Sequence, residues 1–123
     1  MPVQTDSLKA HLARSNEINI TVIGRKSGRK SSRPVWFVLE GDDLYLLPVE
    51  GSDTQWYQNV LKNPRIEVEV GSAKGEFKAI LITEPPEVAT VADKFRKKYG
   101  PGDVKKYYSK FDVAVLARTQ QAS

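Results

Sequence analysis

The stretch INITVIGRKSGRKSSRPVWFVLEGDDLYLLPV, residues 18–49, decides the fold. Apolar and polar residues alternate over residues 17–23, as in a strand with one buried face. Two further strands are predicted over residues 33–39 and 44–49, where almost every side chain is apolar and both faces are expected to be covered. A cationic turn joins the first two strands and Gly41-Asp42-Asp43 joins the last two, so these strands should run antiparallel.

The rest of the chain adds helices and three more strands. Helical spacing of apolar residues predicts helices over residues 5–15, 54–62, 85–99 and 103–110, and strands are predicted over 65–70, 77–83 and 111–116. Six short strands with hairpin turns favour an antiparallel six-stranded sheet curled into a barrel, a mainly β (α+β) fold with flanking helices. We expect one domain over residues 1–123, with an N-terminal helix within 1–16 and a flexible tail at 119–123.

The composition argues against several kinds of chemistry. The 123-residue chain has no cysteine and a single histidine, His11, so neither thiolate catalysis, nor a metal site, nor a serine triad is expected. An enzyme of this composition would depend on a bound cofactor for its reactive chemistry. No apolar leader begins the chain and no segment is apolar enough to span a membrane, so a cytoplasmic location is expected.

The turn over residues 24–33 carries five cations and is the strongest indication of a binding site. Arginine and lysine form charge-assisted hydrogen bonds to phosphate oxygens, and glycine lets the backbone approach an anion closely. The net charge of +4 also suits an anionic partner. The candidate phosphate ligands are Arg25, Lys26, Ser27, Gly28 and Arg33. A solvated hairpin without a ligand is the alternative, since exposed turns often carry lysine and arginine.

Two segments together resemble the deazaflavin-dependent nitroreductase family. Residues 24–28 (GRKSG), followed by Pro34-Val35, resemble the phosphate-binding stretch of that family. Residues 54–64 (TQWYQNVLKNP), followed by 68–71 (VEVG), resemble its Trp-Tyr-x-Asn-Leu-x-x-Asn-Pro helix and the next strand. Residues 33–38 are also similar to the wider group of flavin-binding split barrels related to pyridoxamine phosphate oxidase. The resemblance covers about residues 20–71, and we expect it to continue to residue 117.

The resemblance implies a split β-barrel, usually a homodimer, that binds the deazaflavin coenzyme F-420 near the subunit interface. Such a protein is an oxidoreductase that transfers hydride to a small organic acceptor, namely a nitro compound, a quinone or an activated alkene. The further cofactor-binding candidates are Pro34, Trp36, Pro48, Val49, Gly51, Ser52 and Trp56, and the candidates for substrate pocket or proton donor are Tyr107 and Tyr108. Where the family commonly has arginine this chain has Ser31, and Arg33 has the same strand parity.

Each feature also has an alternative interpretation. FMN is the alternative cofactor, in a protein acting as a reductase, carrier or sensor. Trp36, the helix containing Trp56, and the late tyrosines can all serve packing instead of binding. A barrel that binds single-stranded nucleic acid is the least favoured interpretation, because the aromatic residues fall on elements that are expected to be buried.

Overall fold

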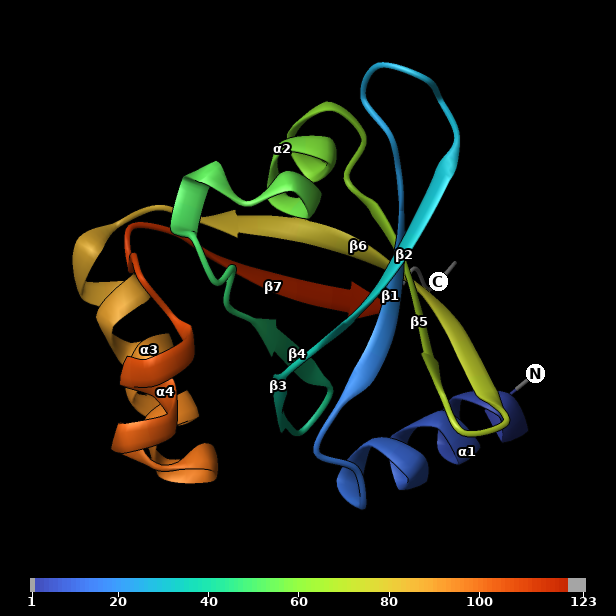
Figure 1. The fold of residues 1–123 in the computed structure, drawn as a ribbon. Helices are drawn as coiled ribbons and strands as arrows, with labels where there is room; N and C mark the ends of the chain where they lie inside the picture. The colour runs from blue at the N-terminus through green and yellow to red at the C-terminus, as the bar shows by residue number, and fades with distance from the viewer. Residues whose placement is uncertain (1, 120–123) are drawn as a thin grey trace.

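The computed structural model describes residues 2–119, with side chains from residue 8 to residue 118. The described strands form one antiparallel sheet in the order β2-β1-β5-β6-β7-β4-β3, which curls into a half-barrel (Figure 1). The strands are β1 (Ile18–Ile23), β2 (Lys30–Val35), β3 (Phe37–Glu40), β4 (Asp43–Leu46), β5 (Arg65–Val70), β6 (Ala73–Ile82) and β7 (Ala114–Thr119). The helices are α1 (Pro2–Ala13), the 3-10 turn η1 (Gly51–Asp53), α2 (Gln55–Lys62), α3 (Pro85–Tyr99) and α4 (Pro101–Tyr107).

The helices cover the curled sheet at separate places. Helix α1 packs against β6 and β5 at one end of the sheet, whereas α3 and α4 pack on one another beside β3, on the far side of the molecule from α1 (Figure 1). Helix α2 lies against β1. In the described part of the chain, no helix is both long and apolar enough to cross a membrane.

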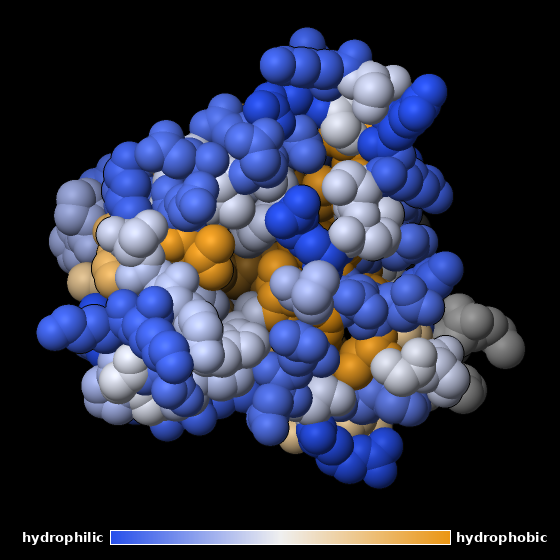
Figure 2. Space-filling model, in the orientation of Figure 1, coloured by the Kyte–Doolittle hydropathy of each residue, from blue (hydrophilic) through white to orange (hydrophobic). Residues whose placement is uncertain are grey.

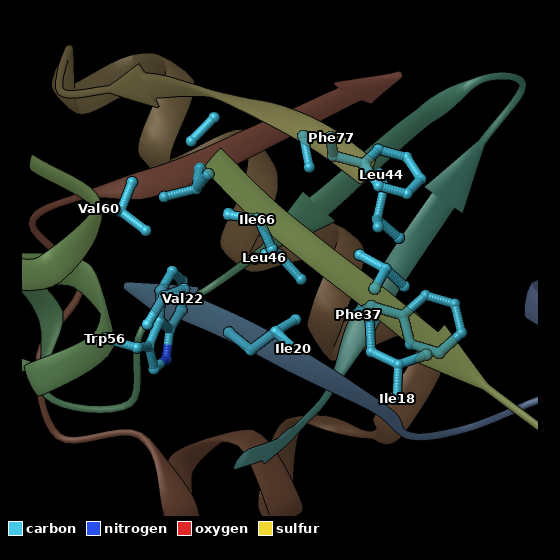
Figure 3. Close-up of a cluster of buried hydrophobic side chains, with 14 of the residues drawn as sticks. Ile18, Ile20, Val22, Phe37, Leu44, Leu46, Trp56, Val60, Ile66 and Phe77 are labelled. Atoms are coloured by element: carbon cyan, nitrogen blue, oxygen red, sulfur yellow. The ribbon is translucent and has the colours of Figure 1, made fainter. Parts of the chain in front are cut away.

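Two apolar clusters hold these elements together. The larger one fills the inside of the curled sheet, where Ile20 of β1, Phe37 of β3 and Leu46 of β4 are completely buried and Trp56 of α2 closes one side (Figure 3). The smaller one joins α3 and α4 to β3 and β4, with Phe95 at its centre. The sheet is therefore covered on both faces at β3 and β4, as their apolar sequences predict.

The register between β1 and β2 determines which side chains of the basic hairpin point inward. Ile18 lies opposite Val35 and Ile20 lies opposite Arg33. Residues directly opposite each other in an antiparallel pair share a face, so Arg33 lies on the same face as the buried isoleucines. On the other face, the hydroxyls of Thr21 and Ser32 lie 2.6 Å apart and form a hydrogen bond.

The structure has seven strands where the sequence predicts six, because the predicted strand over residues 33–39 is divided. Its first part is β2, which pairs with β1, and its second part is β3, which pairs with β4. The chain passes between the two opposite edges of the sheet at Trp36, so a continuous strand is impossible there. The alternation of buried and exposed residues carries no information about this change of partner.

Other predicted boundaries move by a few residues. Strand β6 begins at Ala73, because Gly71 adopts a positive φ of 59° and completes the turn earlier than predicted. The last strand occupies Ala114–Thr119 instead of residues 111–116, so residue 119 does not belong to a tail. The remainder of the predicted tail, residues 120–123, lies outside the described residues.

Candidate functional site

A cavity of about 430 Å³ opens beside the free edge of β2. Of the predicted site residues, its walls contain Arg33, Pro34, Trp36, Val49, Trp56, Tyr107 and Tyr108. The predicted residues that do not line it are Arg25, Lys26, Ser27, Gly28, Pro48, Gly51 and Ser52. In Figure 2, apolar surface is visible at the centre of the face, with hydrophilic residues around it. Because β2 is an edge strand, part of its backbone has no neighbouring strand to pair with on this side.

An aromatic group forms one wall of the cavity. The ring of Trp36 stacks on the ring of Tyr99 with centroids 4.2 Å apart and an interplanar angle of 8°. Tyr107 meets the same indole edge-on at 5.6 Å, and Tyr108 is tilted against it at 6.0 Å. Contacts on several sides therefore restrict the orientation of Trp36. Trp36 is therefore packed against α3 and also faces the cavity, so its packing role is observed and its contact with the cofactor ring stays a prediction.

The hydroxyl of Tyr99 explains how this wall is fixed to the sheet. The backbone N–H of Phe37 donates to it at 3.0 Å, and the hydroxyl has carbonyl acceptors in Asn16 at 2.8 Å and Phe37 at 2.9 Å. One side chain of α3 thus joins β3 to the segment that enters β1. Burial raises the pKa of Tyr99 to about 12, so the hydroxyl keeps its proton at neutral pH.

The neighbouring Lys98 shares this anchoring point. Its ammonium donates to the carbonyl of Phe37 at 2.8 Å and lies 3.5 Å from the centroid of that ring. Desolvation lowers the pKa of Lys98 to about 8, because the partners on the protein are a neutral carbonyl and an aromatic face. Lys98 therefore changes charge in the mildly alkaline range.

The two candidate tyrosines of α4 and its C-terminus differ sharply in accessibility. Tyr107 is 55% exposed at the mouth of the cavity, whereas Tyr108 is 5% exposed and contacts Phe95 and Phe111. Burial raises the pKa of Tyr108 well above its ordinary value. Tyr107 is consequently the better placed of the two to exchange a proton with a ligand and with water.

The loop between β4 and α2 is bound to the segment before β7. Asp112 accepts hydrogen bonds from the backbone N–H of Ser52 at 2.9 Å and from its hydroxyl at 2.6 Å. Although desolvation acts in the opposite direction, these bonds and Lys110 hold the pKa of Asp112 below its ordinary value. Gly51 has a φ of 56°, and a Cβ added there would lie 2.1 Å from the Asp112 carboxylate. The polar groups of Ser52 are therefore occupied within the protein.

The basic hairpin is bound to α2 through Arg25. Its backbone N–H and Nη1 donate to the Asn59 side-chain oxygen at 3.1 and 2.7 Å, and Nη2 donates to Gln55 at 3.0 Å. The amide of Gly28 donates to the Gly24 carbonyl at 2.9 Å, so it too is used within the turn. Among the side chains of residues 8–118, Lys26 and Arg33 have no ion-pair partner. These two cations retain their full hydrogen-bonding capacity for an anion.

Four residues of the cavity wall are not among the predicted site residues, namely Glu17, Val35, Leu47 and Thr54. Val35 could have been found, because it shares strand parity with Arg33. Thr54 directly precedes α2, and its hydroxyl accepts from the Glu50 backbone N–H at 2.8 Å instead of capping the helix. No local pattern singles out Glu17, which lies just before β1 and reaches the cavity because of the pairing between β1 and β2.

Comparison with solved structures establishes the class of fold. An F420-H2 dependent reductase (FDR-A) superposes with a TM-score of 0.66 at 22% identity, over 84% of this chain and 94% of that one. A structure described as a domain-swapped dimer gives 0.67 at 20% identity, over 93% and 98%. A putative pyridoxamine 5'-phosphate oxidase from Listeria innocua gives 0.67 at 18% identity, over 94% and 93%. The expected split β-barrel with flanking helices is confirmed.

The sequence also matches a family model directly. The model describes the F420H(2)-dependent quinone reductase family, and the match spans residues 5–118. This chain belongs to that family. It is therefore a deazaflavin-dependent oxidoreductase whose cofactor is coenzyme F-420, as the resemblance of residues 24–28 and 54–64 implies.

Proposed function

We propose that this protein uses reduced coenzyme F-420 to reduce a quinone held in the cavity beside β2. The observation that carries the proposal is the gathering of Trp36, Tyr107 and Arg33 around one space of about 430 Å³. That volume lies within the range of small-molecule sites, roughly 300–1,000 Å³. Nitro compounds and activated alkenes are the other acceptors implied by the resemblance, and both would use the same flat aromatic wall.

The residues around the cavity suit the cofactor in two ways. An apolar, aromatic-lined space accommodates a planar ring, while the exposed cations Arg33 and Lys26 suit the phosphate end. We assign Arg25 a positioning role, because its guanidinium already binds Asn59 and Gln55. A direct contact between Arg25 and phosphate, like contacts from Ser27, Gly28, Pro48, Gly51 and Ser52, remains a prediction.

When bound, the reduced deazaflavin supplies a hydride, which together with one proton converts a quinone carbonyl system to the hydroquinone. The protein's own contribution is orientation and exclusion of water. Trp36 presents a fixed flat face to a planar ligand, and the buried Leu47 keeps that part of the wall dry. Tyr107 is assigned as the proton donor to the reduced acceptor, since its hydroxyl-bearing ring lines the cavity and is exposed to solvent from which it can be reprotonated.

Equilibrium titration with oxidised F-420 tests the cofactor assignment, with quenching of tryptophan fluorescence as the signal. Replacing the two predicted phosphate ligands that have no ion-pair partner (Lys26→Gln with Arg33→Gln) should weaken binding on the order of a hundredfold, since hydrogen bonds to charged groups each contribute about 1.5 kcal/mol or more. The matched control, Lys74→Gln with Lys78→Gln, removes two exposed charges from β6 and should leave binding unchanged. Equal affinities in the two double variants would refute the phosphate assignment.

The same titration discriminates the alternative cofactor and the alternative ligand. FMN should bind more weakly than F-420. Tighter binding of FMN would identify FMN as the cofactor instead. Oligonucleotide binding that falls steeply with salt would instead support the nucleic-acid interpretation. A cytoplasmic location and a single cofactor-binding domain over residues 1–123 remain predictions.

A homodimer is part of the proposal. One of the structural neighbours is described as a domain-swapped dimer, and β6 of this chain leaves Ile80 and Leu81 38% and 39% exposed. Sedimentation analysis of the purified protein should give twice the mass of the 13.8 kDa chain. If the protein is a monomer at all concentrations, the cofactor site cannot lie at a subunit interface.

A further inference from the structure

Glu17 places a carboxylate in the cavity, where its negative charge opposes the binding of an anionic group beside it. It lies in the cavity wall together with Trp36, and it is exposed. Among the described side chains it has no ion-pair partner. The negative charge of Glu17 also acts on the nearby Tyr99. Burial raises the pKa of Tyr99 most, and the charge of Glu17 raises it further.

The pairing of β1 with β2 separates Glu17 from the cation in the same cavity. Ile20 lies opposite Arg33 and Ile18 lies opposite Val35, so Glu17 continues the register toward Trp36. Three residues along a strand correspond to about 10 Å. The cavity wall therefore carries one positive and one negative side chain, and these two do not form an ion pair with each other.

We propose that Glu17 selects the electron acceptor by charge, admitting neutral or cationic planar molecules and rejecting anionic ones. The inference rests on the proposed function, in which the Arg33 end of the cavity holds the anionic part of the cofactor. The acceptor is then left beside Glu17 and Trp36, whose ring is supported by stacking on Tyr99. An anionic acceptor would meet a carboxylate there without a compensating cation.

The aromatic wall acts in the same direction as the carboxylate. The face of an indole or phenol ring carries negative electrostatic potential, which attracts cations and not anions. Apolar walls such as Leu47 lower the local dielectric constant and strengthen the field that Glu17 imposes on a bound molecule. The discrimination should consequently exceed that of an isolated surface carboxylate.

Equilibrium dialysis of two matched quinones tests the selection without relying on turnover. The protein is saturated with oxidised F-420, and binding of naphthoquinone is compared with binding of its sulfonate, which has the same ring and one negative charge. In the wild type the sulfonate should bind about tenfold more weakly. Glu17→Gln should strengthen sulfonate binding about fivefold and leave the neutral quinone unchanged.

Controls separate the inference from the proposed function. Glu69→Gln removes an exposed glutamate on β5 outside the cavity and should reproduce the wild-type ratio. Raising the salt concentration should reduce the wild-type preference, a second measurement that needs no variant. If F-420 binds but Glu17→Gln and salt both leave the ratio unchanged, the selection by Glu17 is refuted while the reductase assignment stands. If F-420 itself is not retained in the dialysis cell, the proposed function and the inference both fail.

Discussion

Replacing Tyr99 by phenylalanine removes one hydroxyl from the point where β3, α3 and the segment before β1 meet. In the wild type this hydroxyl receives the Phe37 N–H at 3.0 Å and has the Asn16 carbonyl at 2.8 Å as an acceptor. The Phe37 carbonyl keeps its bond from Lys98 in the variant. Two backbone groups therefore lose a partner, and the ring that stacks on Trp36 is retained.

The expected cost follows from those two groups. Each net hydrogen bond contributes about 1 kcal/mol, and water can partly reach this site because Tyr99 is only half-buried. We expect Tyr99→Phe to lower the free energy of unfolding by about 1–2 kcal/mol, which corresponds to a fall in Tm of roughly 4–8 °C for a domain of this size. Tyr99→Ala should cost about 3 kcal/mol or more, because the stacked ring is lost as well.

Urea denaturation followed by tryptophan fluorescence measures both variants. Tyr45→Phe is a matched control, since the Tyr45 hydroxyl has no hydrogen-bond partner among the described residues and its ring lies under Lys94. That control should unfold within a few tenths of a kcal/mol of the wild type. Coincident urea midpoints for Tyr99→Phe and the wild type would show that the hydroxyl does not stabilise the junction of β3 with the segment before β1.

Three further predictions concern the same region. Lys98 has a pKa of about 8 in the folded protein and an ordinary value of 10.5 when unfolded, so the unfolded state binds more protons between these two pH values. The free energy of unfolding should therefore rise from pH 8 to pH 9.5. Urea titrations at each pH should show this rise in the wild type and not in Lys98→Met. Gly51→Ala should lower the free energy of unfolding by about 2–3 kcal/mol, since it combines a positive φ with a Cβ at 2.1 Å from Asp112. Gly41 also has a positive φ but open space around it, so Gly41→Ala should cost about 1 kcal/mol in the same assay. Tyr107→Phe should lower kcat for quinone reduction at least about tenfold without changing F-420 affinity; an unchanged kcat would assign the proton to solvent.

The regular elements could be predicted because their signal is local. The alternation of Ile18, Ile20 and Val22 identifies β1, and the apolar stripe of Trp56, Tyr57 and Val60 identifies α2. Each pattern reflects one buried face, which the structure reproduces. The choice of neighbouring strand is not local. No property of residues 33–39 indicates that their first half pairs with β1 and their second half with β4.

The residues of the candidate site likewise divide into those that the sequence indicates and those whose availability depends on partners far away in the chain. The resemblance to the family implies Trp36, Val49 and Tyr107 as site residues, and the fold brings them to one cavity. The resemblance also implies Ser52, but its donors are taken by Asp112, sixty residues later in the chain. Long-range partners of this kind cannot be read from spacing, and they decide which polar groups remain available to a ligand.

The five cations of the basic hairpin illustrate why fold and charge must be considered together. In the sequence both Arg25 and Arg33 are candidate phosphate ligands, since both flank the same turn. Pairing with β1 aims Arg33 at the cavity, while Asn59 and Gln55 hold Arg25 on α2. The amide partners of Arg25 are neutral, however, so they fix its guanidinium without cancelling its charge. Arg25 thus binds the hairpin to α2 and still adds to the positive field that draws an anion toward Arg33. Substitution by a neutral residue would remove both the attachment and the charge. Substitution by lysine would remove the attachment and keep the charge.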